Sequence, residues 1–587
     1  MLKKALNQFF QEVNYKGWFL ILFGTLTWSL TMVKSGLVYK IGMGFWGPNG
    51  HDGVWHIALA QSLANGSWSM PIFSGELIRN YHVGFDLILT IIHKITFIPI
   101  TTLYFQILPP ILAFLIGLFV YLFVLSWARS KTAAWWATFF VYFAGGWGWL
   151  VTLFRNGEIS GESVFWSQQS VSTLVNPPFA LSLVFIFAGL YFLIKGLKVR
   201  KSHTTNYMLL ATFLFGILIQ IKVYAGILVL FGLFAAGFWR MLKRGGIDLM
   251  KVFTGSLIIS ILIFSPFSRD IGQTINYQPF WFLETMVSSP DRFYWPKMAS
   301  AIANYKLAGN WLKLFLAYGV TFAIFWFGNL GIRVIKVPLF FKHIRNIREL
   351  SYIEVFFYSV IGMGVVIPTL FVQKGTPWNT IQFFYYSLVF SGILAGVFLG
   401  EFIDKVNLNT REIPGSPIRI RTWYGTVIVV VLLAITTTFG TLRHYLPTRP
   451  PAMISIDELE ALEFLSKQPN GVVLTQPFGK EAADTAAAHP PRPLYLYEST
   501  AYVSAFSGKP TYLEDEVNLE ITGYDWRERR RLVEPFFGEN CKIDKSFFSR
   551  ENISYVYLVK QNFCNREFEN FADKIFENLE IVIYKIT

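Results

Sequence analysis

The chain has 587 residues, of which 53% are hydrophobic and 18% aromatic, whereas only 15% are charged. Soluble domains carry about 25% charged residues, so the composition excludes a purely soluble protein. The formal net charge is +14. Lys and Arg form scattered clusters between apolar blocks rather than one continuous basic face, which argues against a nucleic-acid-binding protein.

The apolar residues occur in long blocks, and about 20 in a row are enough to cross a bilayer. Together with shorter apolar segments, these blocks predict an all-α, multi-pass membrane domain over residues 1–441, with about 11 to 13 transmembrane helices. The clearest blocks are Tyr15–Val38, Thr102–Trp127, Phe179–Ile194, Val252–Phe267, Trp311–Gly331, Ile353–Val372, Ile381–Leu399 and Trp423–Phe439.

The basic clusters predict the topology, because cytoplasmic loops are rich in Lys and Arg. They place the amino terminus inside and the first loop, residues 39–80, outside. One region leaves two alternatives open. Two full crossings between Tyr81 and Trp127 would put Arg129 and Lys131 outside, so either residues 81–99 insert only partly or two basic residues break the rule.

The first loop contains an acid and two histidines in the segment Gly50–His56. Asp52 and His56 are four residues apart, so on a helix they share one face. A carboxylate beside an imidazole at a membrane surface is typical of proton transfer or metal binding. We therefore predict Asp52, His56 and His51 as catalytic residues. The same three side chains are candidate ligands for a divalent metal such as zinc or manganese, although their spacing matches no specific metal motif.

Further polar side chains follow in and after the same loop. Glu76, His82 and Trp55 are candidates for contacts to a sugar or an acceptor, and Arg79 is a candidate for a phosphate contact. His82 and Asp86 also have helical spacing. The alternative is that these side chains are simply solvated loop residues, which suits Glu76 and Arg79 well.

Two lysines lie in tight turns that are predicted to face outside. Lys374 lies between two spans in residues 372–380, and Lys222 lies where two short helices meet. A lipid phosphate at the interface needs an opposing charge, so both lysines are candidate phosphate ligands. The alternative is that each long side chain only reaches toward the interface.

The chain changes character after Phe439. A proline-rich linker, residues 446–451, leads into a polar segment. Ser455 and Glu458 form a capping-box pattern that predicts a helix to about Lys467. Strands are predicted at 471–475, 553–560 and 579–586, and another helix at 526–536. Residues 442–587 are thus predicted to form a small, soluble α/β domain outside the membrane.

The same tail contains both cysteines of the chain and an acidic triplet. Cys541 and Cys564 are candidates for a disulfide, because an outer compartment is oxidising; two unrelated thiols are the alternative. Residues 514–516, Glu-Asp-Glu, resemble a metal-binding triplet, but in a soluble tail we expect them to be a solvated charge run.

An outer loop with an acid after the first span, many further spans and a soluble outer tail resemble the GT-C superfamily of polytopic glycosyltransferases, which includes protein mannosyltransferases and the lipid A aminoarabinose transferase type. The likeness runs through Asp52, the helix after it (54–60), residues 80–82, residues 378–386 and residues 500–508. It covers nearly the whole chain, although its motifs are short.

The resemblance implies a transferase in the plasma (inner) membrane that takes a sugar from a polyprenyl-phosphate donor on the outer face. Its first-loop acid would serve as general base, a role that carries over to Asp52. Family members often have a paired acid there, whereas this chain has His51 and Gly53 as neighbours. Two alternatives stay open: a non-enzymatic transporter or flippase of a lipid-linked glycan, and a degenerate member that acts as a membrane scaffold.

Overall fold

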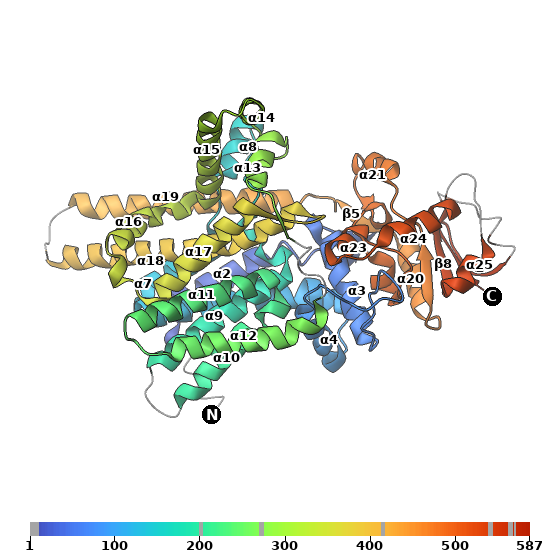
Figure 1. The fold of residues 1–587 in the computed structure, drawn as a ribbon, viewed down its shortest axis with the longest axis horizontal. Coiled ribbons are helices and arrows are strands. Elements are labelled where there is room, and N and C mark those ends of the chain that lie inside the picture. Colours follow the sequence, from blue (N-terminus) through green and yellow to red (C-terminus); the bar gives the residue numbers. More distant parts are fainter. Residues whose placement is uncertain are drawn as a thin grey trace. The chain divides into compact units, whose positions relative to one another are not determined.

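The computed structural model describes residues 11–198, 203–268, 275–412, 417–537, 544–560, 568 and 571–586. Contacts group the chain into two compact units (Figure 1). Unit 1 comprises Met1–Leu30, Pro110–Pro266 and Ile275–His444, and unit 2 comprises Thr31–Pro109, Phe267–Thr274 and Tyr445–Thr587. The sequence placed the division near residue 441; the contacts also assign residues 31–109 to the unit that contains the tail.

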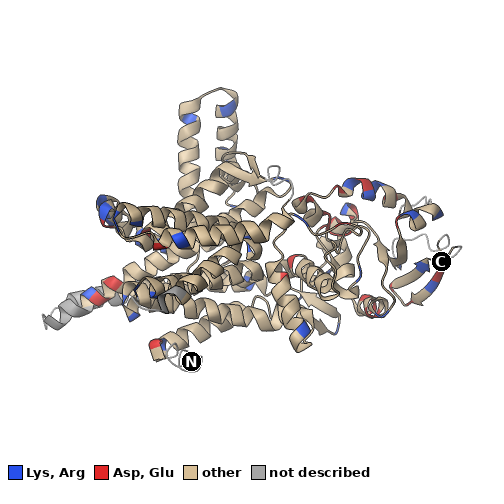
Figure 2. Ribbon diagram, turned by 60° about the horizontal axis from the view of Figure 1, so that its bottom comes forward, with Lys and Arg blue, Asp and Glu red and all other residues tan. Residues whose placement is uncertain are grey.

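Unit 1 is mainly helical. Its Lys and Arg residues, blue in Figure 2, gather near helix ends and are sparse along the helices. The last turn of α9, for example, contains Lys195 and Lys198. The helices are α2 (Tyr15–Ser29), α6 (Leu108–Ala128), α7 (Lys131–Phe143), α8 (Gly148–Asn156), α9 (Pro177–Lys198), α10 (His203–Ile221), α11 (Val223–Leu242), α12 (Asp248–Phe264), α13 (Trp281–Ser288), α14 (Pro296–Leu307), α15 (Trp311–Leu330), α16 (Val337–Arg345), α17 (Tyr352–Leu370), α18 (Gln382–Glu412) and α19 (Pro417–Tyr445), with short helical turns η3 (Ser170–Val175), η6 (Gly331–Lys336), η7 (Ile347–Glu349) and η8 (Pro377–Ile381).

The prediction of a multi-pass membrane domain is confirmed, with fewer long spans than expected. Among the described residues, 8 helices are long and apolar enough to cross a membrane, and α7 with α8, bent by 42°, would make a ninth. The shorter apolar helix α10 adds to these. The predicted total of about 11 to 13 also includes apolar segments whose helices are shorter than 18 residues.

Helix length gives the physical reason. At about 1.5 Å per residue, the 15 residues of α2 and the 13 residues of α4 (Gly84–Thr96) fall short of a hydrocarbon core of about 30 Å. The short α4 favours the alternative in which residues 81–99 insert only partly.

Close contact between α18 and α7 depends on glycine. Gly396 and Gly400 lie one turn apart on the face of α18 that meets α7, and a Cβ atom at either would lie 2.4 Å from the Cα atom of Ala137 or Ala133, respectively. No side chain separates the two backbones there. Small residues at four-residue spacing let membrane helices approach in this way.

Unit 2 combines the first loop with the tail. The first loop and the segment after it contain β1 (Leu37–Tyr39), β2 (Gly42–Phe45), η1 (Gly47–Gly50), α3 (Asp52–Ala64), α4, α5 (Ile100–Thr102) and the π-helical turn η2 (Leu103–Ile107). The tail contains β5 (Ala452–Ile454), α20 (Ile456–Ser466), β6 (Val472–Thr475), α21 (Lys480–Ala487), β7 (Arg492–Pro493), η9 (Leu494–Leu496), α22 (Tyr502–Ser507), α23 (Glu516–Thr522), α24 (Trp526–Val533), η10 (Glu534–Phe536), α25 (Lys545–Arg550), β8 (Ile553–Val559), β9 (Ala572–Glu577) and β10 (Ile581–Ile586).

Two sheets organise unit 2. One has the order β6-β8-β10-β9, with β8 parallel to β6 and antiparallel to β10. The other has the order β1-β2-β5-β7, so strands of the first loop and strands of the tail share a sheet. Gly42 permits this pairing: its φ is +125°, and a Cβ there would lie 2.1 Å from the carbonyl oxygen of Ile454.

The predicted α/β tail is confirmed in detail. Ser455 and Glu458 form the capping box of α20, with both reciprocal hydrogen bonds present. The predicted strands correspond to β6, β8 and β10, and the helix predicted at 526–536 corresponds to α24 and η10. These elements have strong local signals, namely a cap and runs of β-branched and aromatic residues.

Candidate functional site

Asp52 begins α3, the helix that follows η1. Its carboxylate lies in the first turn, where the partial positive charge of a helix amino terminus favours an anion. Nδ1 of His51 lies 2.9 Å from Oδ1 of Asp52. The Asp52 side chain is 49% exposed, so a substrate hydroxyl can reach it. Asp52 is therefore paired with His51, and not with His56 as the four-residue spacing had suggested.

The tail supplies further neighbours of this pair. The ring of Tyr497 stacks on His51 with centroids 6.3 Å apart, and the guanidinium of Arg492 lies 3.4 Å from the Tyr497 ring centroid. Burial and Arg492 lower the pKa of His51, but the charge and hydrogen bond of Asp52, together with the charge of Asp515, outweigh them and raise it. The environment thus favours the imidazolium form of His51.

The acidic triplet Glu514-Asp515-Glu516 was expected to be solvated, and this expectation is wrong. The three residues are 7%, 4% and 5% exposed. Glu514 accepts hydrogen bonds from the backbone N–H groups of Val503 and Ser504, which begin α22. Asp515 caps α23 by accepting from the N–H of Asn518. From sequence, a run of charges is expected to be solvated, but here Glu514 and Asp515 accept hydrogen bonds at helix amino termini and Glu516 pairs with Arg530.

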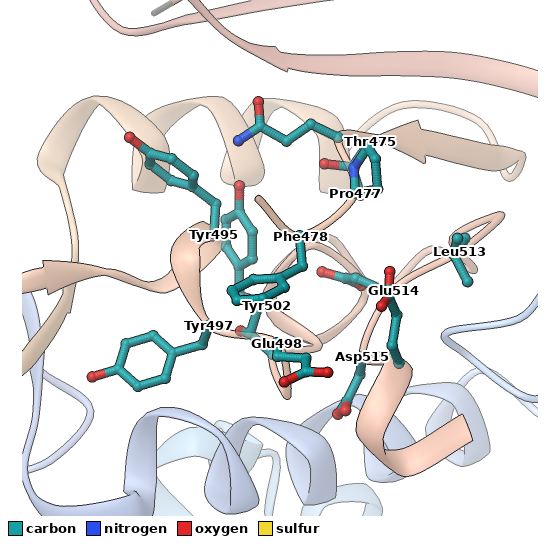
Figure 3. A pocket seen from close by; sticks show the side chains of 13 residues that line it. Thr475, Pro477, Phe478, Tyr495, Tyr497, Glu498, Tyr502, Leu513, Glu514 and Asp515 are labelled. Carbon is teal, nitrogen blue, oxygen red and sulfur yellow. The ribbon is translucent and has the colours of Figure 1, made fainter. Parts of the chain in front are cut away.

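The buried carboxyls line a pocket with Tyr497, Tyr502 and Glu498 (Figure 3). Burial raises the pKa of Glu514 to about 7, against the backbone hydrogen bonds that lower it. Burial likewise raises the pKa of Asp515 to about 7; Asn518 and His51 oppose this shift, and the charge of Asp52 adds to it. Asp515 thus joins the pocket to the His51–Asp52 pair electrostatically.

His56 does not face the same partner as Asp52. Its Nδ1 lies 2.8 Å from Oδ1 of Asp86 on α4, and both residues are buried, at 5% and 0% exposure. His82 precedes α4 and stacks on Tyr81 with centroids 4.6 Å apart, so it does not share a helix face with Asp86 as the spacing suggested. The structure therefore assigns His56 and Asp86 to the contact between α3 and α4.

The predicted metal ligands do not converge. Within the part of the chain that the structure describes, no group of three or more His, Cys, Asp or Glu side chains is arranged to hold a metal ion. His51 pairs with Asp52, whereas His56 pairs with Asp86. These residues therefore do not fit a metal centre in this arrangement.

Three other predicted residues contact neighbours within unit 2. The guanidinium of Arg79 lies 4.4 Å from the ring centroid of Tyr524, and its Nη2 donates to the carbonyl of Gly523 at 3.4 Å. Trp55 is 2% exposed and meets the Tyr81 ring edge to face. Glu76 is half-buried and carries its negative charge near Arg529.

The two candidate lysines belong to one region of unit 1. Lys222 is the N-cap residue of α11, is 5% exposed, and its Nζ donates to Oδ1 of Asn176 at 3.3 Å. Its neighbour Tyr224 donates its hydroxyl to Oε1 of Gln373 at 3.1 Å. Gln373 ends β4 (Phe371–Gln373), which pairs with β3 (Ile275–Tyr277) and is followed by the exposed Lys374. The structure thus brings the two predicted turns together.

Sequence reasoning missed Asp515, Arg492 and Tyr497 beside Asp52, and Asn176 beside Lys222. Asp515 could have been predicted as an N-cap residue, because Asp is favoured immediately before a helix, and its side chain accepts from the N–H of Asn518, three residues later. The others have none, since their importance comes from residues far away in the sequence. The predicted disulfide partners, Cys541 and Cys564, lie outside the described residues.

No protein-family model and no curated protein matches the sequence. Solved structures do. The oligosaccharyltransferase AglB of Archaeoglobus fulgidus, in complex with an inhibitory peptide and a dolichol-phosphate, matches at a TM-score of 0.52 and 12% identity, over 93% of this chain and 69% of that one. The same archaeal enzyme in complex with Zn and sulfate matches at 0.51 and 12%, over 94% and 69%.

ArnT from Cupriavidus metallidurans, bound to undecaprenyl phosphate, covers 97% of this chain and 98% of its own at 11% identity, with a TM-score of only 0.42. The conclusion therefore rests on the archaeal structures, and at such low identity it concerns the fold alone. The chain has the fold of the GT-C polytopic membrane glycosyltransferases, as its sequence predicted.

Proposed function

We propose that the chain is a membrane glycosyltransferase that moves a sugar from a polyprenyl-phosphate donor to an acceptor, with Asp52 as general base. The observation that carries the proposal is the half-exposed Asp52 carboxylate beside His51 at the start of α3, in a chain with the AglB fold. The archaeal structure holds a dolichol-phosphate, which supports a lipid-phosphate donor here.

The chemistry follows from the residues. Asp52 accepts the proton of the acceptor hydroxyl as its oxygen bonds to the anomeric carbon, while the bond from that carbon to the donor phosphate breaks. Attack from the opposite side inverts the anomeric centre. A positioned base contributes about 10²- to 10⁴-fold in rate. His51, whose environment favours the imidazolium form, pairs with the Asp52 carboxylate and orients it.

The leaving lipid phosphate carries negative charge and needs a cation rather than a proton donor. Lys222 and Lys374 are our candidates, because each is a cation in a turn that the sequence places on the outer side. The hydrogen bond between Tyr224 and Gln373 joins these two turns within unit 1. Arg79, the third candidate, already packs on Tyr524, so we assign it to structure rather than to the phosphate.

The proposed setting is a plasma (inner) membrane, with the first loop and the tail on its outer face. The clusters of Lys and Arg at helix ends support this orientation. The donor's isoprenoid chain would then stay in the bilayer while its sugar reaches Asp52. The other partners are membrane lipids and an acceptor on the same face.

The test is Asp52→Asn in the purified full-length protein with radiolabelled polyprenyl-phosphate sugars. We expect transfer to fall by at least about 100-fold with an unchanged melting temperature. The matched control is Asp573→Asn, since Asp573 is an exposed carboxylate on β9 of the same unit. Full activity in Asp52→Asn would refute the assignment. Movement of labelled lipid across vesicles without transfer would indicate a flippase, and binding of partners without either activity would indicate a scaffold.

A further inference from the structure

An apolar groove runs between α15, α16 and α17 of unit 1. Its volume is about 620 Å³. Most of its walls are aromatic or aliphatic, including Trp326, Phe340 and Ile361, and its few polar side chains are Lys336, His343 and Tyr358. A space of this size and lining suits a hydrocarbon chain rather than a sugar or a peptide.

One buried basic side chain lines the groove: Lys336, which is 7% exposed. Arg333, one helical turn earlier, is 3% exposed and lies behind it, outside the lining of the groove. Lys336 donates to the hydroxyl of Ser391, and Arg333 donates to the carbonyl oxygen of Ala144. Within the described ranges, no carboxylate lies at ion-pair distance from either cation. Neither of these basic side chains is therefore ion-paired within the described part of unit 1.

The helix that covers the groove is amphipathic. α16 presents exposed apolar side chains such as Phe341 (64%) and Ile344 (54%), and its last turn carries Lys342, His343 and Arg345. Such a helix lies in a membrane interface with its apolar face among the acyl chains and its cations at the headgroups. Basic clusters beside transmembrane helices attract anionic lipids of the cytoplasmic leaflet.

We propose that this groove binds an anionic phospholipid of the cytoplasmic leaflet, with one acyl chain along α15 and α17 and the phosphate beside the cations of α16. Charge complementarity selects this occupant over a neutral lipid. The polyprenyl donor is a poorer match, because the groove is bordered by the basic segment 333–348, which the sequence places on the inner side. The proposal does not depend on the transferase reaction.

Gly362 offers a clean test. It lines the groove, and a Cβ at this position would meet no protein atom within 4 Å. Gly362→Leu therefore fills the groove without displacing the protein. Gly425→Leu is the matched control, since Gly425 lies on the membrane helix α19, also has open space around its Cβ, and lies away from the groove.

The measurement is native mass spectrometry of the full-length protein with added phosphatidylglycerol or phosphatidylcholine. We expect one retained phosphatidylglycerol per native chain and per Gly425→Leu chain, and roughly tenfold weaker retention in Gly362→Leu. Replacing Lys342 and Arg345 with Gln should cut the preference for phosphatidylglycerol by about fivefold per charge.

Three results would overturn the proposal: native retention in Gly362→Leu, equal retention of both lipids by the native chain, or displacement of phosphatidylglycerol by equimolar undecaprenyl phosphate. The last result would indicate a donor site instead. Melting temperatures of the variants within a few degrees of the native value will show that each is folded.

Discussion

Replacing Asp86 with Leu would leave His56 buried in unit 2 without the carboxylate that lies 2.8 Å from its Nδ1 atom. Leaving one partner of a buried hydrogen bond unsatisfied costs about 1–3 kcal/mol. For a folded unit of about 150–250 residues, each kcal/mol lowers the melting temperature by about 2–4 °C. We therefore expect Asp86→Leu to melt roughly 5 °C below the native protein.

The variant Asp86→Asn separates the loss of the hydrogen bond to His56 from the loss of the negative charge. Asp86→Asn keeps an oxygen that accepts from the imidazole N–H, so it should lose no more than about 1.5 kcal/mol. The assay is thermal unfolding of purified full-length protein in detergent, with sugar transfer measured well below the melting temperature. Asp573→Leu, on the exposed face of β9, serves as the control for removing a carboxylate.

The outcome decides the role of His56, which the sequence suggested as a catalytic residue. If the pair holds α3 against α4, loss of stability and loss of transfer will run in parallel, and Asp86→Asn will restore both. If Asp86→Leu melts at the native temperature but transfers no sugar, the structural role is refuted and His56 acts in the reaction.

Three further predictions concern other parts of the chain. Burial raises the pKa of Glu514 from its ordinary 4.5 to about 7, so about 3 kcal/mol of stability present below pH 4.5 is lost as the pH rises through 7. The melting temperature should therefore fall over that pH range, and it should fall less steeply in Glu514→Gln. Equal slopes in the two proteins would contradict the raised pKa of Glu514. Lys222→Met and Lys374→Ala should raise the apparent KM for the lipid donor by about tenfold or more, and an unchanged donor dependence in both would exclude a phosphate role. Gly396→Val should lower the melting temperature by the equivalent of about 1–3 kcal/mol, because its side chain meets the α7 backbone, whereas Gly425→Val should not; equal melting temperatures would argue against close packing of α18 on α7.

Much of the candidate site could be predicted from local pattern. Asp52 was selected because an acid follows the first apolar block, and the structure shows it half-exposed at a helix start. The partner of His56 could not be predicted, because four-residue spacing suggested Asp52, whereas packing of α3 on α4 brought in Asp86. The prediction that the acidic triplet around Asp515 is solvated was wrong for a similar reason. Its burial depends on helices whose amino termini need hydrogen-bond acceptors.

The sequence by itself determined the features that depend on neighbouring residues. Unbroken apolar runs predict membrane helices, and the Ser455–Glu458 box together with β-rich runs predicts the α/β tail. Only the tertiary structure showed that β2 of the first loop pairs with β5 of the tail, so that Asp52, Tyr497 and Asp515 belong to one unit. Those contacts join segments some 400 residues apart, and their stability comes from burial and hydrogen bonds that exist only after the chain has folded, so no local pattern records them.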